Sequence, residues 1–288
     1  MAQLKARRPE NVDGDFFVDT SCIDCDTCRW MAPDVFGRDG DMSAVHTQPT
    51  TSEQRVQALK ALLSCPTASI GTVSAPRDIK QTQADLPDLV EANVYHCGYH
   101  SEKSYGAASY FIQRPEGNIL IDSPRFTPPL VKQLEAMGGV KYLYLTHRDD
   151  VADHAKFQQH FDCARILHAD DITTDTQSVE IHLQGHALHQ LTDDITIIPV
   201  PGHSKGHTVL LYQARFLFTG DHLAWSVYLG HLYGFRRFCW YSWAEQVKSM
   251  QRLTDYSFEW VLPGHGRRFH SNTMAKELQT CIEWMQQT

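Results

Sequence analysis

The sequence has no long apolar run and no excess of basic charge. None of its apolar runs approaches the roughly 18 residues of a membrane-spanning helix. Its 26 lysine and arginine residues are outnumbered by 34 acidic residues, and the net charge of −8 excludes a generally basic face for nucleic acid. The N-terminal stretch is polar and holds no apolar signal-peptide core. We therefore expect a cytoplasmic protein without membrane or nucleic-acid partners, or an organelle matrix protein whose presequence is missing.

Signatures of metal-free catalysis are also lacking. No glycine-rich cofactor loop, Ser-His-Asp set or Cys-His arrangement stands out, and no flavin motif is recognisable. The hydrophobic content of 42% is ordinary for a globular protein, so the chain can bury a sizeable core.

Four of the eight cysteines form a pattern. Cys22, Cys25 and Cys28 follow a C-x2-C-x2-C spacing, and Cys65 arrives much later, directly before Pro66. Three clustered thiolates with a remote Cys-Pro are the ligand pattern of an iron–sulfur cluster. Four thiolates also suit zinc, but zinc sites usually present two separated pairs, which favours the cluster here.

Residues 14 to 74 resemble the single-cluster bacterial ferredoxins. The stretch CRWMAPDVF matches that family's C-x3-[CA]-P-[DE]-V-F pattern, and CPTASI matches its remote Cys-Pro turn. Ala32 stands where many relatives have a cysteine, so one cluster is expected. A helix capped at Thr51 and Ser52 would deliver the remote ligand. The resemblance implies one [4Fe–4S] cluster with the ligands Cys22, Cys25, Cys28 and Cys65.

The ferredoxin-like part is strongly acidic. The segment from Glu10 to Glu53 contains ten acidic residues and only two basic ones, Arg29 and Arg38, so its net charge is −8. Such a surface suits the docking of a basic redox partner, and a merely solvated face accounts for it equally well.

A second domain follows a polar segment. Residues 76–90 contain two prolines and no periodicity, which predicts a linker between a ferredoxin-like domain of residues 1–75 and a domain of residues 91–288. Short β-like runs and helical patterns then alternate, which predicts sheets inside and helices outside. Polar residues close several predicted strands, where they can converge on one sheet edge. They are Asp122, His147, His203, His207, Asp221, His222 and His265.

These residues lie in motifs that resemble the metallo-β-lactamase superfamily over residues 91 to 270. The motifs occur in the family's order as ILIDSP, THRDDVADH, PGHSKGH, FTGD and LPGHG. The resemblance implies an αββα sandwich with a metal site along one edge. It also implies that His203 and His265 are metal ligands and that Asp221 bridges two metals. We therefore expect an α+β ferredoxin domain followed by an αββα metallo-β-lactamase-fold sandwich.

The THRDDVADH motif departs from the family spelling T-H-x-H-x-D-H. In one interpretation the site keeps two metals, the first held by His147, Asp149 and His203, the second by Asp153, His154 and His265, with Asp221 as the bridge. A gapless alignment instead puts Val151 and Ala152 at the second site and leaves one metal. A third interpretation makes Asp149 and Asp150 helix N-terminal residues of a decayed site. We favour the first, since a decayed site would have no reason to keep its other ligands together.

The carboxylate of Asp149 bears on the metal and on the reaction. Carboxylate ligands shift preference from zinc toward iron or manganese, and the flavodiiron proteins of this superfamily carry a glutamate there and bind two irons. We expect one or two divalent ions, Fe or Zn, and hydrolysis of a small-molecule ester, thioester or phosphoester, with Asp153 and Asp221 as catalytic residues. The first alternative is an oxidoreductase whose cluster feeds electrons to a di-iron site. The second is a redox-sensing binding module.

An aromatic stretch separates the last two motifs. Residues 222–243 carry eight aromatic residues together with Arg236 and Arg237. Such an insertion can shape a pocket over the site, with the arginines meeting an anionic substrate. The same aromatic residues can instead pack the domains together, which is the interpretation we favour.

Overall fold

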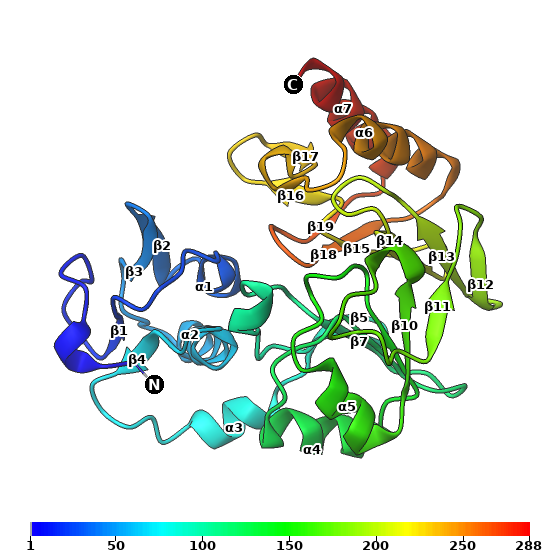
Figure 1. Ribbon diagram of the computed structural model, residues 1–288. Helices are drawn as coiled ribbons and strands as arrows, with labels where there is room; N and C mark the ends of the chain where they lie inside the picture. The colour runs from blue at the N-terminus through cyan, green and yellow to red at the C-terminus, as the bar shows by residue number, and fades with distance from the viewer. Residues whose placement is uncertain (1) are drawn as a thin grey trace. The chain divides into compact units, whose positions relative to one another are not determined.

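A computed structural model describes residues 2–288 (Figure 1). The chain divides into two compact units. The first comprises the chain up to Lys141 together with Ala152–Asp162, and the second comprises Tyr142–Val151 together with Cys163–Thr288. No helix in the described part of the chain is long and apolar enough to cross a membrane.

The ferredoxin-like part of the first unit contains two small antiparallel sheets and two helices. Strands β1 (Phe16–Val18) and β4 (Ile70–Thr72) pair with each other, as do β2 (Phe36–Asp39) and β3 (Met42–Val45). Helix α1 (Thr27–Met31) packs against α2 (Ser52–Ser64) over a core that includes Phe16, Leu59 and Ile70. Thr51 caps α2 through a capping box with Gln54, which confirms the predicted helix start.

The remainder of the first unit is built on an antiparallel sheet. Its strands are β5 (Asp88–Glu91), β6 (Val94–His96), β7 (Tyr110–Ile112) and β8 (Ile119–Ile121), and each pairs with the next along the chain. Its helices are α3 (Ile79–Ala84), α4 (Pro128–Ala136) and α5 (His154–Phe161). The predicted linker of residues 76–90 thus holds α3 and most of β5, and the domain boundaries at 75 and 91 stay a prediction.

The second unit contains three groups of strands. Strands β9 (Tyr142–Tyr144), β10 (Ala164–His168) and β11 (Ile181–Leu183) are parallel. A second sheet has the order β12 (His189–Thr192), β13 (Ile195–Pro199), β14 (Thr208–Tyr212), β15 (Phe216–Gly220), β18 (Trp260–Pro263) and β19 (Phe269–His270). Strands β16 (Ala224–Ser226) and β17 (His231–Tyr233) form a separate hairpin.

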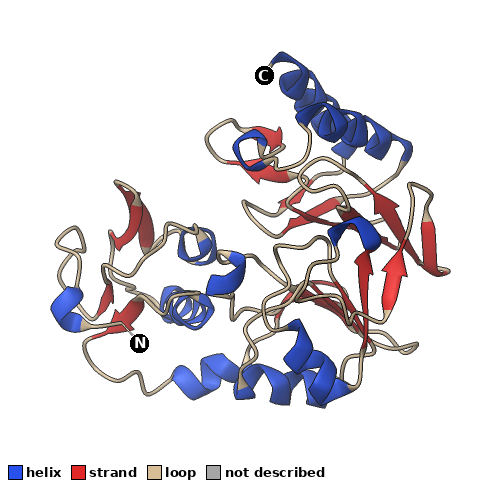
Figure 2. Ribbon diagram, in the orientation of Figure 1, coloured by secondary structure: helices blue, strands red, loops and turns tan. Residues whose placement is uncertain are grey.

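Two helices cover the six-stranded sheet. Helices α6 (Trp243–Arg252) and α7 (Met274–Gln287) lie side by side at the C-terminal end of the chain (Figure 2). Their buried residues, among them Met250 and Leu278, pack with Ile198 and Val261 of the sheet in one core. Because this core holds β13, β15 and β18 in place, the loops that follow these strands start from fixed positions.

Candidate metal centres

The four cysteines of the ferredoxin-like motif surround one cavity. The residues that line it include Cys22, Cys25, Cys28 and Cys65. Asp24 and Asp26 adopt positive φ angles of 57° and 68°, so the loop curls tightly between the first three cysteines. The remote cysteine is positioned by α2, at whose C-terminal end it lies.

Backbone donors point at two of the sulfur atoms. The Ser43 amide donates to Cys22 Sγ at 3.4 Å, and the Ser69 amide donates to Cys65 Sγ at 3.3 Å. Burial raises the pKa of the Cys25 thiol to about 11, so bound cations are needed to keep it as a thiolate at neutral pH. Four thiols around one pocket, two of them buried and two of them with amide donors on their sulfur atoms, fit an iron–sulfur cluster.

The surroundings of Cys25 include residues far along the chain. Cys25 Sγ is hydrogen bonded to Thr27 Oγ1 at 3.3 Å, and Thr27 Oγ1 lies 3.0 Å from His100 Nδ1. His100 Nδ1 also lies 2.7 Å from the Gly106 carbonyl, which can only accept, so this nitrogen carries the proton. His100 Nε2 then accepts from His96 Nε2 at 2.8 Å. Residues beyond the ferredoxin-like part therefore help to fix the cluster environment.

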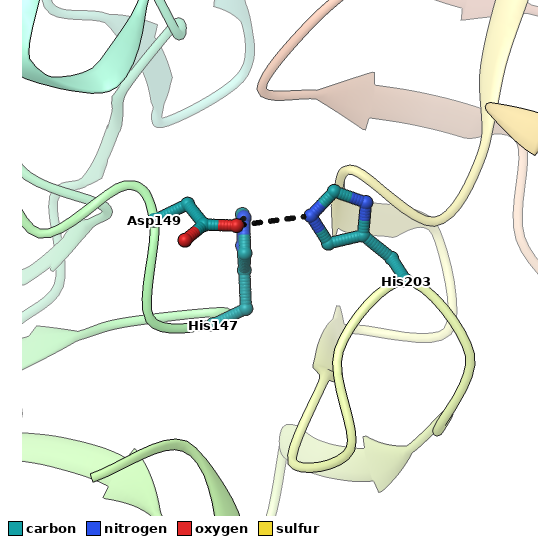
Figure 3. A group of neighbouring side chains, drawn as sticks. All are labelled: His147, Asp149 and His203. Carbon is teal, nitrogen blue, oxygen red and sulfur yellow. Dashed lines mark hydrogen bonds and ion pairs between the residues drawn. The ribbon is translucent and has the colours of Figure 1, made fainter. Parts of the chain in front are cut away.

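In the second unit, His147, Asp149 and His203 converge (Figure 3). Asp149 Oδ2 lies 3.3 Å from His203 Nε2 and 3.8 Å from His147 Nε2. Asp221 Oδ2 lies 3.8 Å from His203 Nε2 and 4.0 Å from His147 Nε2. Ligand atoms about 2.1 Å from one tetrahedral ion are about 3.4 Å apart, so a slight contraction of this group would fit a divalent ion.

Asp221 presents its two oxygen atoms to different histidines. Oδ2 faces His147 and His203, whereas Oδ1 lies 2.8 Å from His265 Nδ1. A second group of buried ligand atoms consists of His147, Asp150 and Asp221. A carboxylate with ligands on both sides is placed as a metal-bridging residue requires.

These side chains come from the ends of strands in the second unit. His147 follows β9, His203 follows β13, Asp221 follows β15 and His265 follows β18. The core of the six-stranded sheet therefore brings His203, Asp221 and His265 together, as the pattern of polar strand ends predicts. The Thr208 amide of β14 donates to the Thr146 carbonyl at 2.9 Å, which ties His147 to the same sheet. Thr146 Oγ1 is hydrogen bonded to His147 Nδ1 at 3.0 Å and so directs Nε2 into the group.

One buried carboxylate, that of Asp171, connects two ligand loops. It accepts hydrogen bonds from the Arg148 amide at 3.1 Å, the Ser204 hydroxyl at 2.5 Å and the Gly206 amide at 2.7 Å. Arg148 directly follows His147, and Ser204 and Gly206 follow His203 in its loop. Close approach also explains a glycine of the LPGHG motif, because a Cβ at Gly264 would lie 2.7 Å from Asp150 Oδ2.

Burial shapes the protonation of the site. Together with repulsion from a neighbouring imidazole, it lowers the pKa of His147 to about 4. It likewise lowers the pKa of His222 to about 3 and that of His207 well below its ordinary value. Burial opposes the charge on Asp221, but the imidazoles around it hold its pKa well below the usual range. At neutral pH the His147 imidazole is therefore neutral and the Asp221 carboxylate is charged, the forms in which these groups bind metal.

The remaining predicted ligands, Asp153 and His154, lie in the first unit, where α5 begins. Asp153 Oδ1 contacts Lys103 Nζ at 3.2 Å and Lys156 Nζ at 3.1 Å, and Oδ2 accepts from the Phe126 amide at 3.0 Å. The grouping of Asp150 with His147 and Asp221 was missed by the sequence reasoning, which left Asp150 without a ligand role. Its only sequence signal is its place next to Asp149.

Comparisons with known proteins support both parts. Residues 18–72 match the family described as the 4Fe-4S single cluster domain of Ferredoxin I. The DIM-1 metallo-β-lactamase is 17% identical over 68% of this chain and 95% of that chain, with a TM-score of 0.53. The metallo-β-lactamase from Pontibacter korlensis is 18% identical over 69% of this chain and 98% of that chain, with a TM-score of 0.52. No curated protein sequence gives a significant match.

The fold is therefore a mixed α/β sandwich of the metallo-β-lactamase type, preceded by a ferredoxin-like region. The predicted resemblances and the predicted fold class are confirmed. The family match supports an iron–sulfur cluster, and the fold is one that holds divalent metals in its lactamase members.

Proposed function

We propose that the protein is a metal-dependent hydrolase of a small-molecule ester, thioester or phosphoester that also carries one [4Fe–4S] cluster. The proposal depends on the convergence of His147 Nε2, Asp149 Oδ2 and His203 Nε2 beside Asp221 Oδ2. Divalent ions held there would polarise a substrate oxygen and lower the pKa of water, the two requirements of such a hydrolysis.

The protein's own residues prepare this chemistry. Because the pKa of His147 is lowered to about 4, the imidazole needs no deprotonation before it binds a metal at neutral pH. Thr146 fixes the ring orientation, and Asp171 holds the two ligand loops together. The site is thereby preorganised for its ligands.

The ligands of the two ions are part of the proposal. The first ion is assigned to His147, Asp149 and His203, with Asp221 as the bridge. The second is assigned, as the sequence predicts, to Asp153, His154 and His265. The position of Asp150 beside Asp221 supports a variant of this assignment in which Asp150 replaces Asp153. Metal analysis of Asp150→Asn and Asp153→Asn decides between them, because only the true ligand's variant should lose one ion per chain.

Hydrolysis is tested with chromogenic probes. Protein stripped of its non-cluster metal and reloaded with zinc or with ferrous iron is assayed with 4-nitrophenyl acetate, S-phenyl thioacetate and bis(4-nitrophenyl) phosphate. We expect metal-dependent turnover of at least one probe, loss of turnover in His203→Ala and no loss in His182→Ala, whose side chain is exposed. Equal turnover by the His203→Ala protein would refute the proposal.

A second candidate function is electron-fed reduction of a small acceptor at a di-iron site. The carboxylate of Asp149 in the ligand group favours iron over zinc, which is the observation that supports it. In this case the reduced cluster would be reoxidised by the non-haem iron during turnover. Anaerobic reduction followed by rapid mixing with oxygen or nitric oxide tests it, because His203→Ala should then slow cluster reoxidation.

The domain extents, partners and compartment complete the proposal. We assign residues 1–75 to the cluster domain and 91–288 to the hydrolase domain. A basic redox protein is the proposed partner of the acidic surface between Glu10 and Glu53, and the cytoplasm or an organelle matrix is the proposed compartment. Cross-linking to a basic redox protein, with and without high salt, tests the partner.

A further inference from the structure

The aromatic stretch after Asp221 divides into a buried and an exposed part. Trp225 and Trp243 pack against the core of the second unit. In contrast, Trp240 is 58% exposed and Phe238 is 49% exposed. Half of the twelve exposed large hydrophobic residues of the described chain lie between Val227 and Tyr241, so this part of the stretch does not pack into the core of the second unit.

Trp240 is tied to a candidate metal ligand through the backbone. The Trp240 and Tyr241 amides donate to the His203 carbonyl at 2.8 and 3.1 Å, and the Ser242 amide donates to the Gly202 carbonyl at 3.0 Å. The Trp240 ring meets the His203 ring edge to face, with 6.2 Å between centroids. Three hydrogen bonds fix the backbone under this exposed indole, and the ring contacts with His203 and Phe238 orient its side chain, so less freedom is lost on binding.

A row of flat groups leads away from His203. After Trp240 comes Phe238, edge to face at 6.1 Å, and the Arg237 guanidinium lies over the Phe238 ring at 5.8 Å. We call Trp240, Phe238 and Arg237 the aromatic row. Neither Arg237 nor the neighbouring Arg236 makes an ion pair within the described chain, although the protein as a whole is acidic. The aromatic row therefore ends in the Arg237 guanidinium, which has no acidic partner within the described chain.

We propose that the aromatic row binds the substrate through a planar, unsaturated group that carries a negative charge. The ring would stack on Trp240 with its edge toward Phe238, whose plane stands at 71° to that of Trp240, and the charge would meet Arg237. The contact between Trp240 and His203 places this group beside the reacting metals. The inference deepens the proposed function, since it names the substrate class of the same site.

Calorimetric titration of cluster-containing, metal-loaded protein tests the inference with three probes. 2-Naphthoate has the ring and the charge, decahydro-2-naphthoate has the charge on a saturated ring, and 2-naphthol has the ring without the charge. We expect 2-naphthoate to bind most tightly and Trp240→Ala to weaken its binding about fivefold. Arg237→Gln should weaken binding of 2-naphthoate and leave that of 2-naphthol unchanged.

Two matched variants serve as controls. Tyr228→Ala removes another exposed aromatic ring of the same stretch, and Arg236→Gln removes the arginine that lies over Trp243 instead. Neither should change binding of 2-naphthoate. Equal binding of the saturated acid, or no loss in Trp240→Ala, overturns the inference. Absence of 2-naphthoate binding also overturns the inference, and the aromatic row would then be a candidate contact surface for a protein partner. Because binding is measured without turnover, failure of the hydrolysis assays would not affect this result.

Discussion

Replacing Thr27 by valine should lower the reduction potential of the cluster. The hydroxyl lies 3.3 Å from Cys25 Sγ, and once that sulfur is a thiolate bound to iron, the hydroxyl must be the donor. Donors to sulfur stabilise the more negative, reduced cluster more than the oxidised one. Valine has nearly the same shape, so the change keeps the packing and removes the hydroxyl with its contacts to Cys25 Sγ and His100 Nδ1.

The size of the shift follows from the strength of such a bond. A hydrogen bond to a charged group contributes roughly 1.5–3 kcal/mol, and the difference between the two redox states is a fraction of that, about 1 kcal/mol. For a one-electron couple this corresponds to about 40 mV. A mediated redox titration followed by electron paramagnetic resonance should therefore show a potential about 40 mV lower in Thr27→Val.

Thr67→Val is the matched control. Its hydroxyl lies 3.8 Å from Cys65 Sγ, so its removal should shift the potential clearly less. Since His100 Nδ1 lies 3.0 Å from Thr27 Oγ1, His100→Leu should also lower the potential, although His100 lies outside the residues that match the ferredoxin family. An unchanged or raised potential in Thr27→Val, or equal shifts in both threonine variants, would refute this reasoning.

Three further predictions concern the second unit. Burial lowers the pKa of His222 to about 3 in the folded protein, whereas the unfolded chain has the ordinary pKa. Below about pH 6.5 the unfolded chain therefore binds a proton that the folded protein does not bind, and stability falls as the pH is lowered. Urea titrations should show that His222→Gln removes about 2 kcal/mol of the loss in unfolding free energy between pH 7 and pH 5; an unchanged loss contradicts this. Asp171→Asn should weaken metal binding about 10- to 100-fold in chelator competition, and full affinity would rule out its positioning role. Gly264→Ala should lose non-cluster metal while keeping its cluster, because its Cβ would displace Asp150; metal retention would count against the grouping of Asp150 with the site.

The parts of the site that sequence reasoning anticipated are those with a fixed relation to regular elements. His203 and Asp221 follow strands of one sheet, and the core of that sheet brings the two strand ends together. His147 follows β9 and is tied to the same sheet by the hydrogen bond from the Thr208 amide to the Thr146 carbonyl. The convergence of the four cysteines could likewise be predicted from the sequence, because a short spacing and a capped helix constrain where their sulfur atoms lie. Here local pattern and global fold specify the same arrangement.

The positions of the carboxylates in the loop between His147 and α5 could not be predicted from the sequence, for a physical reason. It contains no repeating hydrogen bonds, and Ala152 has a positive φ of 24°, so counting residues along it does not fix where a carboxylate lies. Asp149 and Asp150 turn toward the ligand atoms of the second unit, whereas Asp153 contacts Lys103 and Lys156. The exposure of Trp240 could not be predicted either, because aromatic content alone does not distinguish a buried core residue from an exposed one.

Metal and sulfide analysis with Mössbauer spectroscopy, on anaerobically purified wild-type protein and His203→Ala, tests the central claim most directly. We predict about four irons per chain in a cubane cluster in both proteins, and additional metal of which the variant lacks at least one ion per chain. Zinc as that metal supports the hydrolase, and high-spin iron with oxygen and nitrogen ligands supports the electron-fed alternative. Wild-type protein without metal beyond the cluster, or additional metal that is undiminished in His203→Ala, would contradict the two-metal-site assignment.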